Sequence, residues 1–231
     1  MRRALAGVAA VTVAATVSLL AGEALSACTP QIRPVVQPGQ SWQAAYAAAS
    51  GCDEIPLAAG DHGTQALFRD PSKDGSSERV VFRPESGPVS VSFSTGQVGS
   101  TVKRQGADHF ELRDLTVRGQ VAITWARDVV LRRIDAGSFN ITGSQEVSVL
   151  RGDYGPVDNG INHIKACAGC PATDDVLLEG AVLHDVTISS PDKHSECLMI
   201  WTTGGRNITV RNNVFRNCTD FNLFVKAPST S

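Results

Sequence analysis

The stretch FELRDLTV, residues 110–117, places apolar side chains at relative positions 0, 2, 5 and 7, with mainly polar side chains between them. The same spacing returns in four later segments, which begin at Val129, Val147, Val176 and Ile208. Eighteen of the twenty positions that this spacing defines are apolar or aromatic, although only 42% of the chain is hydrophobic. A recurring strand–turn–strand spacing indicates a repeat protein.

The five repeats start 19, 18, 29 and 32 residues apart and show no helical period. Such a unit cannot bury its apolar face alone, so the units stack and each strand pairs in parallel with its counterpart in the next repeat. We therefore predict an all-β, right-handed parallel β-helix, since crossovers between parallel strands are right-handed. An antiparallel sandwich or a propeller is the alternative, but neither requires the spacing to persist through changing loop lengths. The predicted inward residues are Leu112, Val117, Leu131, Ile134, Val149, Leu178, Leu183, Val210 and Phe215.

The two ends of this stack have different sequences. Residues 42–49 are rich in alanine and follow Ser41, a good N-cap, so we expect a short helix that covers the N-terminal end of the apolar stack. The final repeat runs through Phe221, Leu223 and Phe224 without a helix or a polar terminal repeat behind it. A stacked array needs a cap at each end, so we expect that the isolated protein either self-associates through this last repeat or is only marginally stable.

Composition excludes some functions. The chain has 231 residues, 21 Lys and Arg against 23 Asp and Glu, and a formal net charge of −2. Nucleic-acid binding is not expected, because neutralising phosphates requires clustered basic residues. The length suits one domain, which we place at residues 28–231.

Residues 1–27 have the features of a secretory signal peptide: two arginines, an apolar run, and small residues before Cys28. We expect a secreted, extracellular protein without a retained membrane span. The sequence Leu25-Ser26-Ala27-Cys28 also resembles a bacterial lipobox, so the alternative is a lipid anchor at Cys28 on the cell surface. The six cysteines favour the first interpretation, because lipidation of Cys28 leaves an odd number for pairing.

In an oxidising compartment we expect three disulfides. The predicted pairs are Cys28 with Cys52, Cys167 with Cys170, and Cys197 with Cys218. His163-x-x-x-Cys167-x-x-Cys170 is also half of a zinc site, but a closed zinc site needs four ligands, and the disulfide is favoured.

Three segments carry a likeness to known proteins: residues 40–51 (QSWQAAYAAASG), residues 55–63 (IPLAAGDHG) and residues 206–215 (RNITVRNNVF). They resemble secreted bacterial right-handed β-helix proteins of the pectin-lyase-like superfamily. The resemblance implies the fold and a carbohydrate-related role, since that superfamily includes polysaccharide lyases, glycoside hydrolases and adhesins. The chain lacks the Asn-Thr-Asp, Gly-His-Gly and Arg-Ile-Lys set of polygalacturonases and the Trp-Ile-Asp-His strand of pectate lyases.

Two outward-facing clusters are candidate sites. The repeat places Asp135 beside Asp153, one strand spacing apart, which suits a retaining glycosidase or a Ca²⁺ site; no other cofactor is expected. The alternative is a solvated polar face without a function, in which Arg133 and Arg151 offset the repulsion between the two carboxylates. The second cluster joins His184, Asp185, His194, Glu196 and Arg216, with Asp153 assisting, and supplies groups for acid/base cleavage of a polysaccharide. Its alternative is a set of solvated loop residues.

The third and fourth repeats are the longest, and we expect their extra residues, including Asp158, His163 and Lys165, to leave the stack as loops that wall a cleft. Trp125, Tyr154 and Trp201 are the aromatic candidates for sugar binding. We expect a polysaccharide lyase or glycoside hydrolase with a groove along repeats three to five. The alternative is a non-catalytic β-helix that binds a glycan or a protein.

Overall fold

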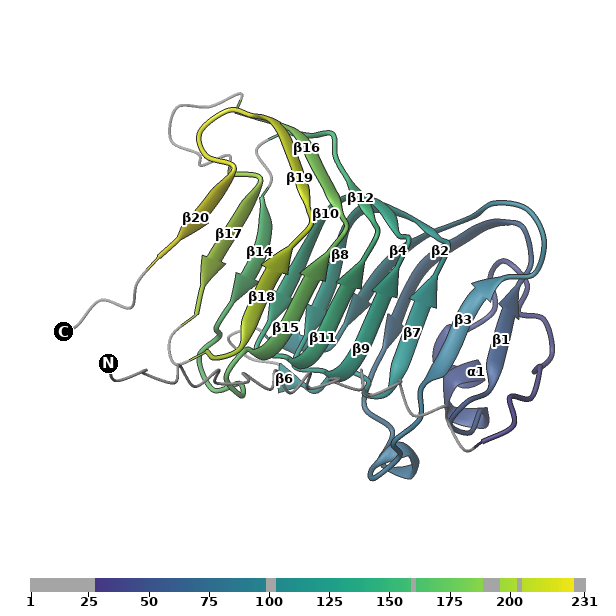
Figure 1. Cartoon of the computed structure of the whole chain (residues 1–231). Helices are drawn as coiled ribbons and strands as arrows, with labels where there is room; N and C mark the ends of the chain where they lie inside the picture. Colours follow the sequence, from purple (N-terminus) through teal and green to yellow (C-terminus); the bar gives the residue numbers. More distant parts are fainter. Residues whose placement is uncertain (1–27, 99–102, 159–160, 189–195, 203–204, 227–231) are drawn as a thin grey trace, which may run out of the picture.

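The structure is a computed structural model that describes residues 28–98, 103–158, 161–188, 196–202 and 205–226 (Figure 1). It is an all-β structure of long parallel sheets, compatible with a β-helix. Strands of successive repeats pair in parallel, as Phe110 with Val129 and Leu112 with Leu131 do, which excludes an antiparallel arrangement of these segments. None of the helices in the described ranges is long and apolar enough to cross a membrane.

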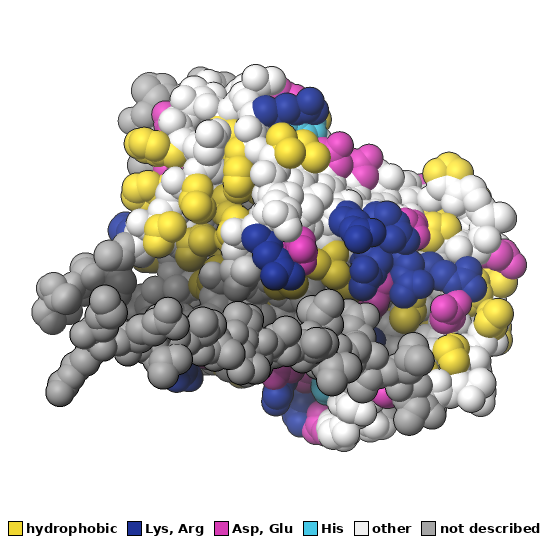
Figure 2. All heavy atoms as spheres, viewed as in Figure 1, with side chains coloured by type: hydrophobic (Ala, Val, Ile, Leu, Met, Phe, Trp, Pro, Cys, Tyr) yellow, Lys and Arg dark blue, Asp and Glu magenta, His cyan; other side chains and the backbone are white. Residues whose placement is uncertain are grey.

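The first sheet has seven strands, each the first strand of its repeat. In spatial order they are β1 (Glu54–Leu57), β3 (Val80–Pro84), β7 (Phe110–Arg113), β9 (Arg127–Arg132), β11 (Gln145–Leu150), β15 (Asp174–Glu179) and β18 (Ile208–Arg211). The sheet therefore extends the predicted stack by two further strands, β1 and β3, on its N-terminal side. Figure 2 shows arginine and lysine side chains beside acidic ones over this part of the molecule.

The second sheet has eleven strands and forms two faces, because its long strands pair with different partners at their two ends. At its start β10 (Asp135–Thr142) pairs with β12 (Asp153–Tyr154), and at its end it pairs with β14 (Asn162–Lys165). The other strands are β2 (Gly60–Leu67), β4 (Val89–Thr95), β8 (Thr116–Thr124), β13 (Val157–Asp158), β16 (Val182–Thr187), β17 (Leu198–Trp201), β19 (Val214–Cys218) and β20 (Leu223–Val225). A small antiparallel hairpin joins β5 (Gln97–Val98) to β6 (Lys103–Arg104).

The first-sheet strands of the five repeats carry a left-handed residue at or just before their start. His109, Asp128, Glu146, Asp175 and Asn207 each precede the first apolar residue of a repeat, and their φ angles lie between 54° and 56°. Asp, Asn and His tolerate this conformation better than most residues because their short polar side chains bond locally. This conformation thus accounts for the polar residue that stands at this position in every repeat.

The core confirms most of the predicted inward residues. Seven of the nine are buried, and Val210 and Phe215, which lie in the last repeat, are partly buried and pack against the core. At the other end α1 (Trp42–Ala48) starts at Ser41, whose side chain accepts a hydrogen bond from the Ala44 backbone N–H, as predicted. Its Trp42 is fully buried and stacks on Phe82, so the helix covers the first repeats. A short 3₁₀ helix, Pro71–Lys73, lies beside it, and Lys73 Nζ donates to the Ala47 and Ala49 carbonyls at the helix end.

The last repeat differs from the others in exposing large apolar side chains. Val214 is 54% exposed and Val225 is 62% exposed. Hydrophobic side chains also gather at this end of the molecule in Figure 2. Self-association through this repeat stays a prediction.

All three predicted disulfides are present. Cys197, which immediately precedes β17, is bonded to Cys218 at the end of β19 with Cα atoms 5.4 Å apart, so the disulfide connects the fourth repeat to the fifth. Three disulfides are compatible with an extracellular protein.

Candidate functional site

The predicted histidine centre lies on the face formed by β12, β16 and β19. His184 is 8% exposed, and its ring nitrogens face two carboxylates: Nε2 lies 2.8 Å from Asp153 Oδ1 and Nδ1 lies 2.6 Å from Asp185 Oδ2. Asn217 Nδ2 donates to the other Asp185 oxygen at 2.6 Å. This hydrogen bond, together with that from His184, lowers the pKa of Asp185. Both ring nitrogens of His184 therefore lie within hydrogen-bonding distance of a carboxylate oxygen.

The other predicted members of this centre are less well assembled. Arg216 is exposed and lies beside His184 on the neighbouring strand. Glu196 is only 1% exposed, so its carboxylate is buried rather than presented to a ligand at the surface. His194 and residues 1–27, the predicted signal peptide, lie outside the described residues. The structure therefore brings together Asp153, His184, Asp185 and Arg216.

Asp135 and Asp153 occupy directly paired positions on β10 and β12, as predicted. Asp153, however, directs a carboxylate oxygen to His184. Within the described residues, neither aspartate belongs to a group of three ligand atoms close enough to hold a metal ion. The only such group there is Cys28, Cys52 and Glu78, whose cysteines are joined in a disulfide. The geometry provides a paired carboxylate face but not a built calcium site.

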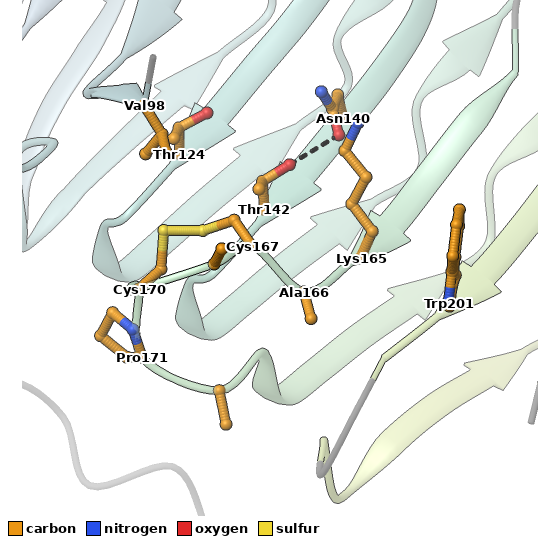
Figure 3. Close-up of a pocket in the computed structure, with 12 residues that line it drawn as sticks. Val98, Thr124, Asn140, Thr142, Lys165, Ala166, Cys167, Cys170, Pro171 and Trp201 are labelled. Carbon is orange, nitrogen blue, oxygen red and sulfur yellow. Dashed lines mark hydrogen bonds between the residues drawn. A yellow bond between two sulfur atoms is a disulfide. The ribbon is translucent and has the colours of Figure 1, made fainter. Parts of the chain in front are cut away.

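A hollow lies on the other face of the second sheet (Figure 3). It has a volume of about 720 Å³, and we call it the Trp201 groove. Its position over the first four repeats differs from the predicted position over repeats three to five. The lining residues are Val98, Thr124, Asn140, Thr142, Lys165, Ala166, Cys167, Ala168, Cys170, Pro171, Ala172 and Trp201.

The floor of the groove is a grid of outward side chains on four parallel strands. One row runs from Thr124 on β8 through Thr142 on β10 and Lys165 on β14 to Trp201 on β17. The row beside it, two residues earlier on each strand, contains Ala122, Asn140, His163 and Met199. Neighbouring positions in a row are about 4.8 Å apart, the spacing of adjacent strands.

One wall of the groove is the loop after β14, closed by the Cys167–Cys170 disulfide. Thr173 anchors this loop at its end: its hydroxyl donates to the Lys165 carbonyl at 2.7 Å and accepts from the Gly143 N–H at 2.9 Å. Gly143 has a φ of 55°, and a Cβ there would lie 2.4 Å from the Cys170 Cβ. The disulfide loop is therefore packed directly on the backbone at the end of β10.

The groove carries positive charge. None of the described residues that line it is acidic, and Lys165 is its one lining cation. Lys226 places Nζ 3.9 Å from the centre of the Trp201 ring, which adds a second ammonium group at the tryptophan end. Trp201 is nevertheless 45% exposed. The site thus combines an accessible aromatic ring with ammonium groups.

Asn140 and Thr142 supply the hydrogen-bonding part of the floor. The Thr142 hydroxyl donates to Asn140 Oδ1 at 2.8 Å. Figure 3 shows the Lys165 side chain extending toward Asn140. Beside them, burial lowers the pKa of His163 to about 4, with a smaller contribution from the Lys165 charge. His163 is therefore neutral at neutral pH.

The sequence interpretation placed His163 and Lys165 in a loop, and this was wrong. They lie on β14, where Asn162 takes an inward position that is apolar in neighbouring repeats. Asn162 is fully buried: its Oδ1 accepts from the Phe139 N–H at 2.8 Å, and its Nδ2 donates to the Cys197 carbonyl at 2.8 Å. An amide satisfied in this way breaks the apolar pattern without breaking the strand.

The three aromatic residues predicted to bind sugar differ in their exposure. Trp201 is exposed in the groove, Tyr154 is fully buried under the His184 face, and Trp125 is partly buried next to Thr124. Asn140 and Thr142 were not predicted; their signal is their alternation with the buried pair Phe139 and Ile141.

Comparison with family models, with curated proteins and with solved structures gave no match for this chain.

Proposed function

We propose that this protein is a secreted, right-handed β-helix protein of the pectin-lyase-like kind that binds an acidic polysaccharide in the Trp201 groove. The handedness and secretion are expected from the sequence, and the superfamily from its resemblance; the parallel sheets are compatible with a β-helix, and the disulfides are compatible with secretion. The polysaccharide class follows from the groove.

The exposed Trp201 ring beside Lys165 is the observation that carries the proposal. A large aromatic face offers apolar area to the C–H face of a sugar ring, while an ammonium group pairs with a carboxylate. An accessible tryptophan alone suits any glycan. The absence of acidic residues among the described lining favours a uronate, since a neutral sugar gains nothing from that charge.

Calorimetric titration with polygalacturonate, alginate and neutral dextran tests this proposal. We expect binding to a uronate polymer, weak or no binding to dextran, and a loss of about tenfold in affinity for Trp201→Ala, the equivalent of about 1.4 kcal/mol. Trp201→Phe keeps an aromatic face and should retain most of the affinity. Arg211→Ala is the control, because it removes an exposed cation that pairs with Glu179 on the first sheet, away from the groove. Equal affinity for dextran, or an unaffected Trp201→Ala variant, contradicts the proposal.

The His184 centre supports a second candidate function, acid/base cleavage of a glycan at the face formed by β12, β16 and β19. A histidine held between two carboxylates, with Arg216 on the next strand, brings an acid/base group and a cation to one place. Loss of polysaccharide cleavage in His184→Gln, with unchanged binding in the Trp201 groove, would support this candidate.

A further inference from the structure

We propose that a second pocket, separate from the Trp201 groove, binds an uncharged sugar ring beside Trp125. The pocket has a volume of about 430 Å³ and lies at the edge of the stack, where the chain passes from the second sheet into the first. We call it the Trp125 pocket, and its lining includes Arg69, Asp74, Asp108, His109, Trp125 and Arg127. Its ligand is independent of the uronate polymer proposed for the groove.

Trp125 stands at a corner where the backbone favours glycine. Thr124 and Thr142 are directly paired on β8 and β10, so the residues that follow them, Trp125 and Gly143, occupy equivalent corners of successive repeats. Gly143 has a φ of 55° and Trp125 has a φ of 50°. Glycine adopts this left-handed conformation freely, whereas a bulky side chain is an outlier there and costs energy. Strained residues gather at ligand sites, which favours a binding role for the partly exposed Trp125 ring.

His109 is held in one orientation by Asp128. Its Nδ1 lies 2.8 Å from Asp128 Oδ2, and Arg79 Nε donates to the other oxygen of that carboxylate at 2.8 Å. Because a carboxylate accepts hydrogen bonds, Nδ1 carries the hydrogen in the neutral ring and Nε2 is an acceptor. Within the described residues no partner of Nε2 is found, so a ligand hydroxyl in the pocket can donate to it.

Asp108 supplies a second polar group beside it. Its Oδ1 accepts a hydrogen bond from the Arg127 N–H at 2.6 Å, and no partner of Oδ2 is found in the part of the chain that the structure describes. Burial raises the pKa of Asp108, although the bond from Arg127 opposes this shift. Gln105 and Gln145 also line the pocket, and each offers an amide donor and an amide acceptor. Sugar hydroxyl groups donate and accept, so they can pair with all of these groups.

The charges on the lining favour an uncharged ligand. Two arginines, Arg69 and Arg127, stand against two aspartates, Asp74 and Asp108. Arg69 already pairs with Asp74, and Arg127 Nη2 lies 2.6 Å from Glu146 Oε1. A uronate carboxylate would therefore meet aspartates without gaining an unpaired cation. The groove proposed for the uronate differs in this respect, since none of its described lining residues is acidic.

A pyranose ring meets these requirements together. Its C–H face packs on the Trp125 indole and buries apolar area, while hydroxyl groups at its rim reach His109 and Asp108. A purine base also stacks on an indole, so adenosine is the contrasting ligand.

Calorimetry on the full protein with small ligands tests the proposal. The ligands are two matched pairs, methyl galactoside with galacturonate and methyl glucoside with glucuronate, together with adenosine. Each pair has the same ring with and without a carboxylate. We expect the neutral member of at least one pair to bind and its uronate to bind about tenfold more weakly.

Trp125→Gly separates binding from folding. Glycine takes the corner conformation without strain, so the melting temperature should not fall, whereas sugar binding should be lost. His109→Asn removes the ring nitrogen but keeps a residue that tolerates the left-handed bend, as Asn207 does at the equivalent position, so affinity should fall about tenfold. Arg211→Ala, on the outer face of the first sheet, is the control and should bind as the wild type does.

Four results overturn the inference: no binding of either neutral sugar, wild-type affinity in Trp125→Gly or in His109→Asn, equal affinity for a neutral sugar and its uronate, and binding of adenosine alone. If Trp125→Gly melts at a lower temperature, His109→Asn decides. Binding of a uronate polymer in the groove is judged separately by Trp201→Ala, which should weaken that binding and leave the small neutral sugar unaffected.

Discussion

The Thr142 hydroxyl donates a hydrogen bond to Asn140 Oδ1 at 2.8 Å, and the two residues are two positions apart on the same face of β10. This bond fixes the orientation of the Asn140 amide, because the oxygen end is occupied and the NH₂ end is left for a ligand. The floor of the Trp201 groove is therefore a set of donors: an amide NH₂ from Asn140 and an ammonium group from Lys165. An arrangement of donors without acidic neighbours selects for an anion.

Replacing Lys165 tests the charge of the groove. Lys165→Met keeps much of the apolar stem but removes the ammonium group, so affinity for a uronate polymer should fall several-fold and depend less on salt. Calorimetry at two ionic strengths measures both effects. A variant with wild-type affinity and wild-type salt dependence would show that Lys165 does not meet the ligand.

Gly143 should be required for the wall of the groove. Gly143→Ala introduces a Cβ 2.4 Å from the Cys170 Cβ at a φ of 55°. Gly119→Ala is the matched control, because its φ is 72° but nothing lies within 4 Å of the added atom. The control should lose about 1 kcal/mol of stability from backbone strain alone. Gly143→Ala should lose more and should also weaken glycan binding, as measured by chemical denaturation and calorimetry.

Equal stability losses in the two glycine variants would show that the disulfide loop yields without cost. In that case the loop is not held against the end of β10 in the way the structure shows.

The burial of the core side chains predicts that truncating them costs different amounts of stability in different repeats. Leu131 is fully buried, so Leu131→Ala should cost about 2–5 kcal/mol of unfolding free energy. Val210 is only partly buried against the core, so Val210→Ala should cost less. Denaturant titration followed by circular dichroism compares the two. The reverse order would contradict the placement of the core.

The low pKa of His163 makes stability depend on pH in a defined window. The folded state holds this group unprotonated down to about pH 4, whereas the unfolded chain binds the proton near its ordinary value of 6.5. The unfolding free energy should therefore fall as the pH is lowered from about 6.5 to about 4 and should not fall further from this group. Melting temperatures across this range should fall less for His163→Gln than for the wild type. Parallel curves would show that His163 titrates normally.

The fold was largely predictable from the sequence because its dominant signal is periodic. Four apolar positions per repeat define both the strands and their parallel pairing, and spacing alone was sufficient to pair Cys197 with Cys218. The face formed by β12, β16 and β19 was also predictable, since its residues follow the same offsets. The repeat spacing alone is therefore enough to place Asp135 and Asp153 at paired positions on neighbouring strands.

The Trp201 groove was not predictable for two physical reasons. The buried amide of Asn162 replaces an apolar side chain with one that bonds to the backbone, so β14 does not follow the apolar pattern. The second strands of the repeats also lie at variable distances from the first, which hides their register. Lys165 is paired with Trp201 on the neighbouring strand. This pairing depends on the loop lengths between the strands, so it is seen only in the three-dimensional structure.

The complex of the protein with a short uronate oligosaccharide, determined by crystallography, tests the central claim most directly. We predict a sugar ring stacked on Trp201, with a carboxylate within hydrogen-bonding distance of Lys165 Nζ and Asn140 Nδ2. Ligand density over Asp153 and His184, with the Trp201 groove empty at saturating oligosaccharide, would contradict it.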